Sequence, residues 1–429
     1  MNGIVILTSV FVVYALVASR LDRLSITAPM VFVVAGVLLG RSVTDQLHLS
    51  LTSEPVLLIV ELTLALLLFA DASTVRLSEV EGDTHLPARL LFVGLPLTIA
   101  LGTVVAVILL PSAGWAAAAL IASILAPTDA ALGLAIFTNR AVPVRIRRAL
   151  NVESGLNDGI ATPFVALFLT LVVSEERGAG SWLLGAGKEI GLALIVAVCV
   201  GVAGGMLLGA AHRRGYTSEV SEQLAILSLA LLAYLGSVAI GGNGFIAAFV
   251  GGLTFGASTG GTMHGATEFT ETIGLFASFF VWTVFGALFV GPVLTTRLDA
   301  TAIVYAVLSL TAIRMVPVAI SLLGAGLRSD TVAFMGWFGP RGLASVVFTL
   351  VTVENLHASG AAYDAIVELA TWTILLSVMV HGLSAGPLAH VYGRRMQGAG
   401  DVPELSDAPE PRVRRRHLGK RHEDGTQRH

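Results

Sequence analysis

The residues that could do chemistry in this chain are charged side chains inside long apolar runs. A charge at the centre of a bilayer is costly unless it is paired or hydrated, so each one in a membrane-spanning segment is a functional candidate. Asp129 and Asp158 have the surroundings expected of an ion site. Seven such residues stand out: Glu61, Asp71, Asp129, Glu153, Asp158, Arg314 and Arg341.

Two of these charges lie beside prolines that should interrupt a helix. Pro127 precedes Asp129 by two residues, and Pro340 directly precedes Arg341. Proline removes a backbone donor and clashes with the preceding turn, so we expect both helices to break there. The breaks lie seven spans apart, and an odd offset reverses the direction through the membrane, as in inverted repeats. Broken helices at matching positions of inverted halves are typical of a transporter's midplane ion site.

The segment 151–159 supplies the companion residues. Ser154 and Asp158 are four apart and share a helical face, while Glu153 and Asn157 share the adjoining one. Together with Thr128, the two aspartates and the carbonyls freed at the breaks, they offer the several oxygens that a hard cation prefers. No His or Cys lies near, so zinc and copper do not fit.

The same carboxylates are suited to coupling cation movement to proton movement, because they bind protons as well as cations. A carboxylate that titrates near neutral pH holds either a proton or a metal cation, but not both at once. Competition for one site produces an exchanger if the form loaded with either ion crosses between the membrane faces and the empty, charged form does not.

The elements that must position these residues are membrane spans. Of the 429 residues, 55% are hydrophobic and only 13% are charged, and the mean hydropathy is +0.82. A soluble domain carries about 25% charged residues. We therefore predict an all-α polytopic membrane protein with about 13 spans. The expected spans are roughly 3–19, 26–40, 55–75, 87–110, 114–137, 150–173, 182–211, 220–240, 243–258, 270–292, 300–324, 331–352 and 363–390.

Basic residues in the loops predict the orientation. With the N-terminus outside, the cytoplasmic loops hold Arg20, Arg23, Arg76, Arg89, Arg140, Arg145, Arg147, Arg148, Arg213, Arg214 and Arg328. The opposite loops hold only Arg41, Arg177, Lys188 and Arg297. This asymmetry satisfies the positive-inside rule and predicts a plasma-membrane protein with its C-terminal tail in the cytoplasm.

The tail, 394–429, is polar and basic, and we predict that it is disordered. No phosphate-binding Gly-x-x-x-x-Gly-Lys segment occurs, so nothing suggests that ATP drives the protein. We expect no cofactor and no nucleic-acid partner, only the membrane and the transported ions.

The segment Glu153–Gly159 resembles that of the monovalent cation:proton antiporters, in particular the Na+/H+ exchanger branch. The resemblance covers roughly 1–393. It extends to Thr128-Asp129, which resembles the family's Thr-Asp in its unwound crossing helix, and to Gly339–Gly342, which resembles the Arg-Gly segment of the second crossing helix.

The resemblance implies roles for these residues. Asp158 would carry the cation or the proton, and Asn157 would steady the site. Asp129, Thr128 and Ser154 would contribute oxygens, so that Na+ would bind at Asp158, Asp129, Thr128 and Ser154.

The family's Asn-Asp pair further implies electroneutral exchange. Glu153 and Arg314 would form a structural ion pair, and Arg341 would compensate the helix ends at the crossing. The resemblance also implies a homodimer in which a core, around 87–173 and 300–390, moves against a dimerising scaffold.

Two departures from the family pattern stand in this sequence. The proline that usually follows Thr-Asp is replaced by Ala130, and Pro127 lies ahead of the pair instead. The third span presents Asp71 one position after the family's usual glutamate, as a further candidate ligand. The residues leave three alternatives open: K+/H+ exchange by the same fold, a cation channel and an ion sensor.

Overall fold

The chain is almost entirely helical. The computed structural model describes residues 2–47, 49–50, 53–75, 85–177, 182–295, 299–359, 363–398, 400 and 402–405. The helices of the first half are α1 (Asn2–Arg23), α2 (Ala28–Leu39), α3 (Glu54–Ser73), α4 (His85–Arg89), α5 (Leu95–Leu109), α6 (Gly114–Leu125), α7 (Leu134–Phe137), α8 (Val144–Arg177), α9 (Trp182–Val198) and α10 (Gly204–Arg213). Those of the second half are α11 (Glu219–Ala239), α12 (Gly244–Thr259), α13 (His264–Phe285), α14 (Gly291–Thr295), α15 (Ala300–Leu310), α16 (Ala312–Ser321), α17 (Ser329–Trp337), α18 (Leu343–Ser359) and α19 (Asp364–Gln397).

These helices account for the predicted spans. In the described residues, nine helical stretches are long and apolar enough to cross a membrane, some of them containing a π-helical turn. Four shorter apolar helices fill the remaining predicted positions: Ala28–Leu39, Pro111–Leu125, Gly244–Thr259 and Leu343–Ala358. The protein is therefore an integral membrane protein, and the predicted fold class is confirmed.

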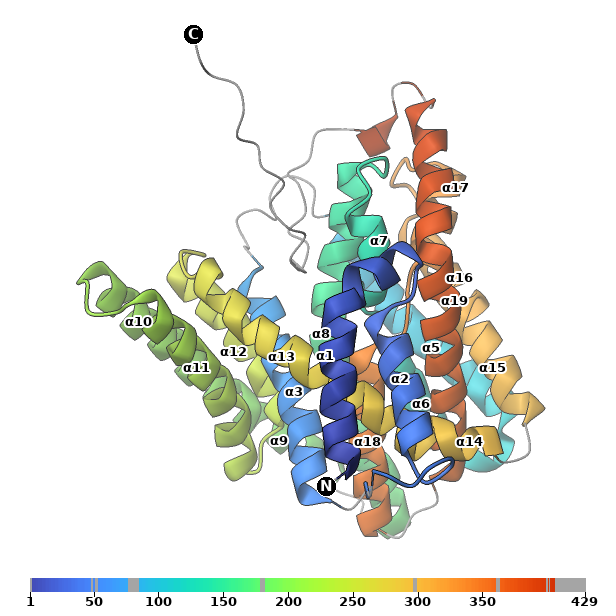
Figure 1. Ribbon diagram of the computed structural model, residues 1–429, viewed down its shortest axis with the longest axis horizontal. Helices are drawn as coiled ribbons and strands as arrows, with labels where there is room; N and C mark the ends of the chain where they lie inside the picture. Colours follow the sequence, from blue (N-terminus) through green and yellow to red (C-terminus); the bar gives the residue numbers. More distant parts are fainter. Residues whose placement is uncertain are drawn as a thin grey trace.

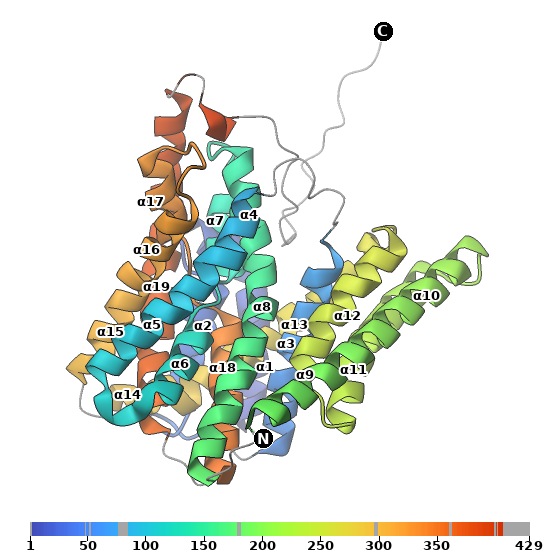
Figure 2. The same ribbon diagram turned by 180° about the vertical axis from the view of Figure 1, so that it is seen from behind.

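Two groups of helices make up the molecule. In Figures 1 and 2, α9, α10, α11 and α12 lean away on one side, while α5, α6, α15, α16, α17 and α19 form an upright body on the other. The central helices α3, α8, α13 and α18 lie between these two groups. The site described below is formed in this central region.

Glycines allow α2 and α12 to pack backbone to backbone against the central helices α13 and α3. A side chain at Gly252 or Gly256 of α12 would collide with the carbonyl oxygens of Phe69 and Ser73 on α3. Gly286, at the end of α13, meets the Val33 carbonyl of α2 in the same way. Such close approach is typical of small residues in membrane helices. It makes α2, α3, α12 and α13 one tightly packed group.

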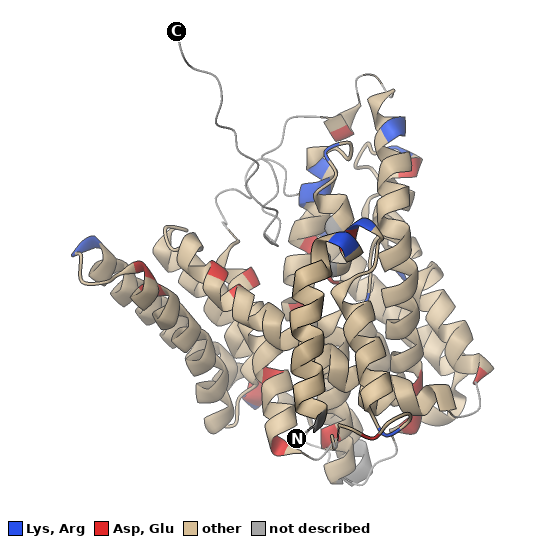
Figure 3. Cartoon of the chain, in the orientation of Figure 1, with Lys and Arg blue, Asp and Glu red and all other residues tan. Residues whose placement is uncertain are grey.

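Basic residues gather at one end of the molecule. Figure 3 shows Lys and Arg concentrated where α19 ends and α8 begins, on the side opposite the N-terminus. This distribution agrees with the basic loops of the sequence. Arg76, Arg297 and the basic stretch 406–429 lie outside the described residues.

The predicted start of the tail differs from the structure. Helix α19 continues to Gln397, beyond the expected boundary at 394, and Pro403–Leu405 forms a 3-10 turn. Glu404 is completely buried there, and its carboxylate accepts hydrogen bonds from the Arg328 amide and the Thr331 hydroxyl, both at 2.8 Å. The first turn of α17 supplies both donors, so this part of the tail is packed. The prediction of disorder for 406–429 falls outside the described residues.

Candidate functional site: two broken helices that cross

The first break follows the end of α6 at Leu125. Pro127 prevents the helix from continuing, and the carbonyl oxygens before it lose their intrahelical donors. Two residues, one in the second break and one in the first turn of α18, replace those donors. The Ser345 hydroxyl donates to the Ile124 carbonyl at 2.7 Å, and the Arg341 guanidinium donates to the Ala126 carbonyl at 3.1 Å. The positive charge of Arg341 thereby lies at the C-terminal end of α6, which is the negative end of its helix dipole.

The second break, between Trp337 and Leu343, offers the opposite charge arrangement. The Leu343 amide at the start of α18 donates to the Asp129 carboxylate at 3.2 Å. A carboxylate at a helix N-terminus is stabilised by the unpaired amides and by the dipole. Each broken helix therefore supplies the charge that compensates the other's open end.

The two extended segments are in direct contact. The Asp129 amide donates to the Pro340 carbonyl at 2.8 Å, and a Cβ at Gly342 would overlap the Asp129 side chain. A Cβ at Gly339 would press on the Arg314 guanidinium 2.5 Å away. The absence of side chains at 339 and 342 is what allows the segments to cross this closely.

Helix α8 brings the third group of polar residues to the crossing. Thr128 lies 3.3 Å from the Ser154 hydroxyl and accepts a hydrogen bond of 2.5 Å from the Asn157 amide. All three side chains are buried. This network fixes the first extended segment against α8 and fixes the rotamer of Asn157.

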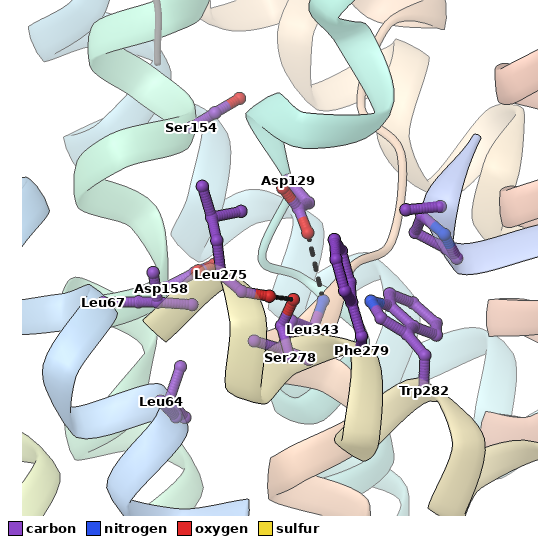
Figure 4. Close-up of a pocket in the computed structure, with 12 residues that line it drawn as sticks. Leu64, Leu67, Asp129, Ser154, Asp158, Leu275, Ser278, Phe279, Trp282 and Leu343 are labelled. Atoms are coloured by element: carbon purple, nitrogen blue, oxygen red, sulfur yellow. Dashed lines mark hydrogen bonds between the residues drawn. The ribbon is translucent and has the colours of Figure 1, made fainter. Parts of the chain in front are cut away.

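A pocket at the crossing holds the candidate ion-binding residues. Asp129, Ser154 and Asp158 line it together, and both aspartates are half-buried. Figure 4 shows Asp129 between α8 and α13, with its carboxylate accepting a hydrogen bond from the Leu343 amide. The other lining residues are Ala28, Pro29, Leu64, Leu67, Leu275, Ser278, Phe279, Trp282 and Leu343. The pocket therefore places two carboxylates and two hydroxyls inside a mostly apolar enclosure.

The expected ion pair is present next to the site. The Arg314 guanidinium lies 2.6 Å from the Glu153 carboxylate, and both side chains are almost fully buried. A buried charge is stable only if it is paired, so each residue requires the other. Neither lines the pocket, which agrees with a structural role.

Asp71 is not among the residues described as lining this pocket. It lies in the last turn of α3 and is half-buried, whereas the residues that α3 contributes to the lining are Leu64 and Leu67. Its role as a ligand stays a prediction.

Sequence reasoning missed the polar residues that the opposite wall contributes. Ser278 and Trp282 of α13 line the pocket, and the Ser278 hydroxyl donates to the Leu275 carbonyl at 2.7 Å. Their spacing of four places them on one helical face, which is the signal available in the sequence. Uncharged side chains in an apolar span did not stand out beside the charged ones.

The fold and the site together define a class. Two interrupted helices cross in an all-helical membrane protein, beside half-buried aspartates and compensating buried charges. This is the fold of the monovalent cation/proton antiporters, which are secondary transporters rather than enzymes.

The chain belongs to the sodium/hydrogen exchanger family. The sequence model described as "Sodium/hydrogen exchanger, transmembrane" matches residues 6–391. The structure is similar to that of the sodium proton antiporter MjNhaP1 from Methanocaldococcus jannaschii, with a TM-score of 0.72 and 21% identity over 91% of this chain and 98% of that one.

Curated relatives carry two different cation names. The chain is 24% identical to the K(+)/H(+) antiporter NhaP2 of Shewanella sp. (strain MR-4), over 85% of this chain and 62% of that protein. It is 26% identical to the Na(+)/H(+) antiporter NhaS2 of Synechocystis sp. (strain ATCC 27184 / PCC 6803 / Kazusa), over 60% of this chain and 46% of that protein. The chain thus spans less than two thirds of the length of either relative.

Proposed function

We propose that the protein exchanges Na+ or Li+ for H+ by competition at the Asp158 carboxylate. The observation that carries this proposal is the pocket in which Asp129, Ser154 and Asp158 meet at the helix crossing. A cation in this pocket finds carboxylate and hydroxyl oxygens, and a proton neutralises the same aspartate. Because one occupant excludes the other, the two ions move in opposite directions by alternating access.

The proposed stoichiometry is one cation for one proton. Asn157 occupies the position beside Asp158 where a second carboxylate would add charge, and its amide is engaged by Thr128. With this neutral partner, the site carries the same net charge when it holds Na+ as when it holds H+. Exchange is then electroneutral.

K+/H+ exchange is the second candidate function. It is favoured by the similarity to NhaP2, a K(+)/H(+) antiporter by name, over 85% of this chain. Carboxylate and hydroxyl oxygens do not by themselves fix the radius of the cation, so the choice is made by measurement.

We further propose a plasma-membrane location with the N-terminus outside, which the gathering of Lys and Arg at one end supports.

The helices around 87–173 and 300–390 are proposed to form the ion-carrying core. The remaining helices are proposed to form a scaffold that dimerises with a second copy. Crosslinking of single cysteines placed on the exposed faces of α9 and α11 tests the dimer.

The test of function is ion exchange in proteoliposomes. An imposed pH gradient is challenged with Na+, Li+ or K+ at a series of pH values, and proton release is followed with an internal dye. We expect cation-dependent proton flux whose apparent Michaelis constant for the cation rises as the pH falls, because protons compete. The proposal fails if no cation drives flux.

The matched variants are Asp158→Asn and Glu268→Ala. The first removes the exchangeable carboxylate with little change of shape, so flux is expected to vanish. The second removes an exposed carboxylate on α13 and is expected to leave flux unchanged. Normal flux in Asp158→Asn contradicts the assignment of the site.

A further inference from the structure

Two buried polar residues of α19 face the second break and have no part in the function proposed above. Ser377 and His381 are 0% and 1% exposed. They are four residues apart on one helix, so their side chains lie on the same face. His381 contacts the backbone where the break begins, at Trp337, and Ser377 contacts it near the end of the break, at Arg341.

The hydrogen bonds of His381 define its tautomer. Nε2 lies 2.9 Å from the Trp337 carbonyl oxygen, and a carbonyl only accepts, so Nε2 carries a proton and donates it. The Ser377 hydroxyl accepts from the Arg341 amide at 2.7 Å and lies 3.1 Å from Nδ1 of His381. Its own proton is therefore available to donate to Nδ1. The ring is neutral in this arrangement.

The alternative is a doubly protonated ring. Nδ1 also lies 3.2 Å from the Ser377 carbonyl, to which a protonated Nδ1 would donate. That form would add a second buried positive charge in the electrostatic field of Arg341, whose side chain is itself fully buried. Bringing like charges together out of water is costly, so the neutral tautomer is the stable one.

The two residues hold both ends of the crossing segment. His381 binds the carbonyl of Trp337, where α17 ends, and Ser377 binds the amide of Arg341, just before α18 begins. Between these anchors lies Pro340, whose carbonyl accepts the Asp129 amide. The segment 337–341 therefore links α19 to Asp129 through these hydrogen bonds.

We infer that Ser377 and His381 are positioning residues that set where the Asp129 carboxylate lies in the ion pocket. The inference rests on the proposed function, because it assigns their effect to cation binding. If His381 only filled space, replacing its ring with another ring of similar size would leave the affinity for the cation unchanged.

The test compares three histidine variants in the exchange assay. His381→Phe keeps a ring of similar volume but loses both hydrogen bonds, and His381→Gln keeps a donor and an acceptor. His390→Phe changes an exposed histidine of the same helix. We expect His381→Phe to raise the apparent Michaelis constant for the cation about fivefold, the factor that corresponds to one hydrogen bond of about 1 kcal/mol. We expect His381→Gln and His390→Phe to remain near wild type.

Ser377 provides an independent variant if His381→Phe does not fold. Ser377→Ala removes only a hydroxyl and is expected to raise the same constant, and Ser377→Thr is expected to restore it. An unchanged Michaelis constant in His381→Phe or Ser377→Ala, with an active wild type, overturns the inference. An inactive wild type instead contradicts the proposed function, so the two failures are distinguishable.

Discussion

The Asp129 amide and the Pro340 carbonyl are joined by a hydrogen bond of 2.8 Å, although they lie 211 positions apart in the chain. This bond links the two interrupted helices backbone to backbone. With the contact between the Asp129 carboxylate and the Leu343 amide, it makes one residue responsible both for the crossing and for the ion pocket. The fold and the chemistry of the site are therefore coupled at Asp129.

Substitution of Gly342 is expected to abolish exchange. In Gly342→Ala the added methyl group overlaps the Asp129 side chain, so the segments must separate and the pocket changes shape. The measurement is proton flux in proteoliposomes at matched protein content. Gly191→Ala on α9 is the control, because no atom lies within 4 Å of its added Cβ. Wild-type flux in Gly342→Ala contradicts the described crossing.

Two substitutions of Asp129 separate its structural role from its charge. Asp129→Asn keeps an oxygen that accepts from Leu343, whereas Asp129→Ala leaves that amide without its side-chain acceptor. Losing a helix N-cap of this kind costs about 1 kcal/mol. We expect both variants to lose cation-dependent flux, but only Asp129→Ala to melt at a lower temperature in detergent. Equal melting temperatures argue against the cap.

The buried pair of Glu153 and Arg314 is expected to behave as a unit. Arg314→Met leaves an uncompensated carboxylate in the interior, at a cost of about 3–5 kcal/mol. Adding Glu153→Gln removes that charge and should recover much of the loss. Thermal unfolding of the two variants measures this. The ion pair of Arg328 and Asp330, 3.0 Å apart with Arg328 exposed, provides the comparison, and Arg328→Ala is expected to change little. A double variant no more stable than Arg314→Met contradicts the pairing.

Replacing Asn157 tests the stoichiometry. Asn157→Asp puts a second carboxylate next to Asp158 and replaces the amide that donates to Thr128. We expect exchange to become voltage-dependent, because the site then carries an additional charge. The measurement is flux at an imposed membrane potential, clamped with valinomycin and K+, with Na+ as the substrate. Voltage-insensitive flux in the active variant contradicts the role given to Asn157, and voltage-sensitive flux in the wild type contradicts electroneutral exchange.

Removing the buried carboxylate of the tail is expected to loosen the start of α17. In Glu404→Ala the Arg328 amide and the Thr331 hydroxyl lose their acceptor, which costs about 1–3 kcal/mol. Hydrogen exchange of 328–332 should become faster, while Glu268→Ala should have no such effect. Unchanged protection of 328–332 in Glu404→Ala shows that the carboxylate does not hold this turn.

The sequence predicted those parts of the fold that have a strong local cause. Apolar length identified the spans, and Pro127 and Pro340 identified the breaks, because a proline acts on its own helix. The ion pair of Glu153 and Arg314 was expected from the resemblance to the antiporter family and not from a local pattern.

What could not be predicted depends on packing between distant helices. Ser278 reaches the pocket only because α13 lies opposite α8, and no local pattern encodes that placement. Similarly, the bond between His381 and Trp337 depends on how α19 lies across the break. The tail boundary was placed too early because Glu404 is polar, and only its donors on α17 explain its burial.

The glycine contacts among α2, α3, α12 and α13 restrict how these helices can move. Gly252, Gly256 and Gly286 leave α2, α3, α12 and α13 no room to slide past one another. These helices provide most of the apolar wall of the pocket, whereas the aspartates belong to the break after α6 and to α8. The wall that these helices form is therefore rigid, and a cation entering the pocket would meet one side that keeps its shape.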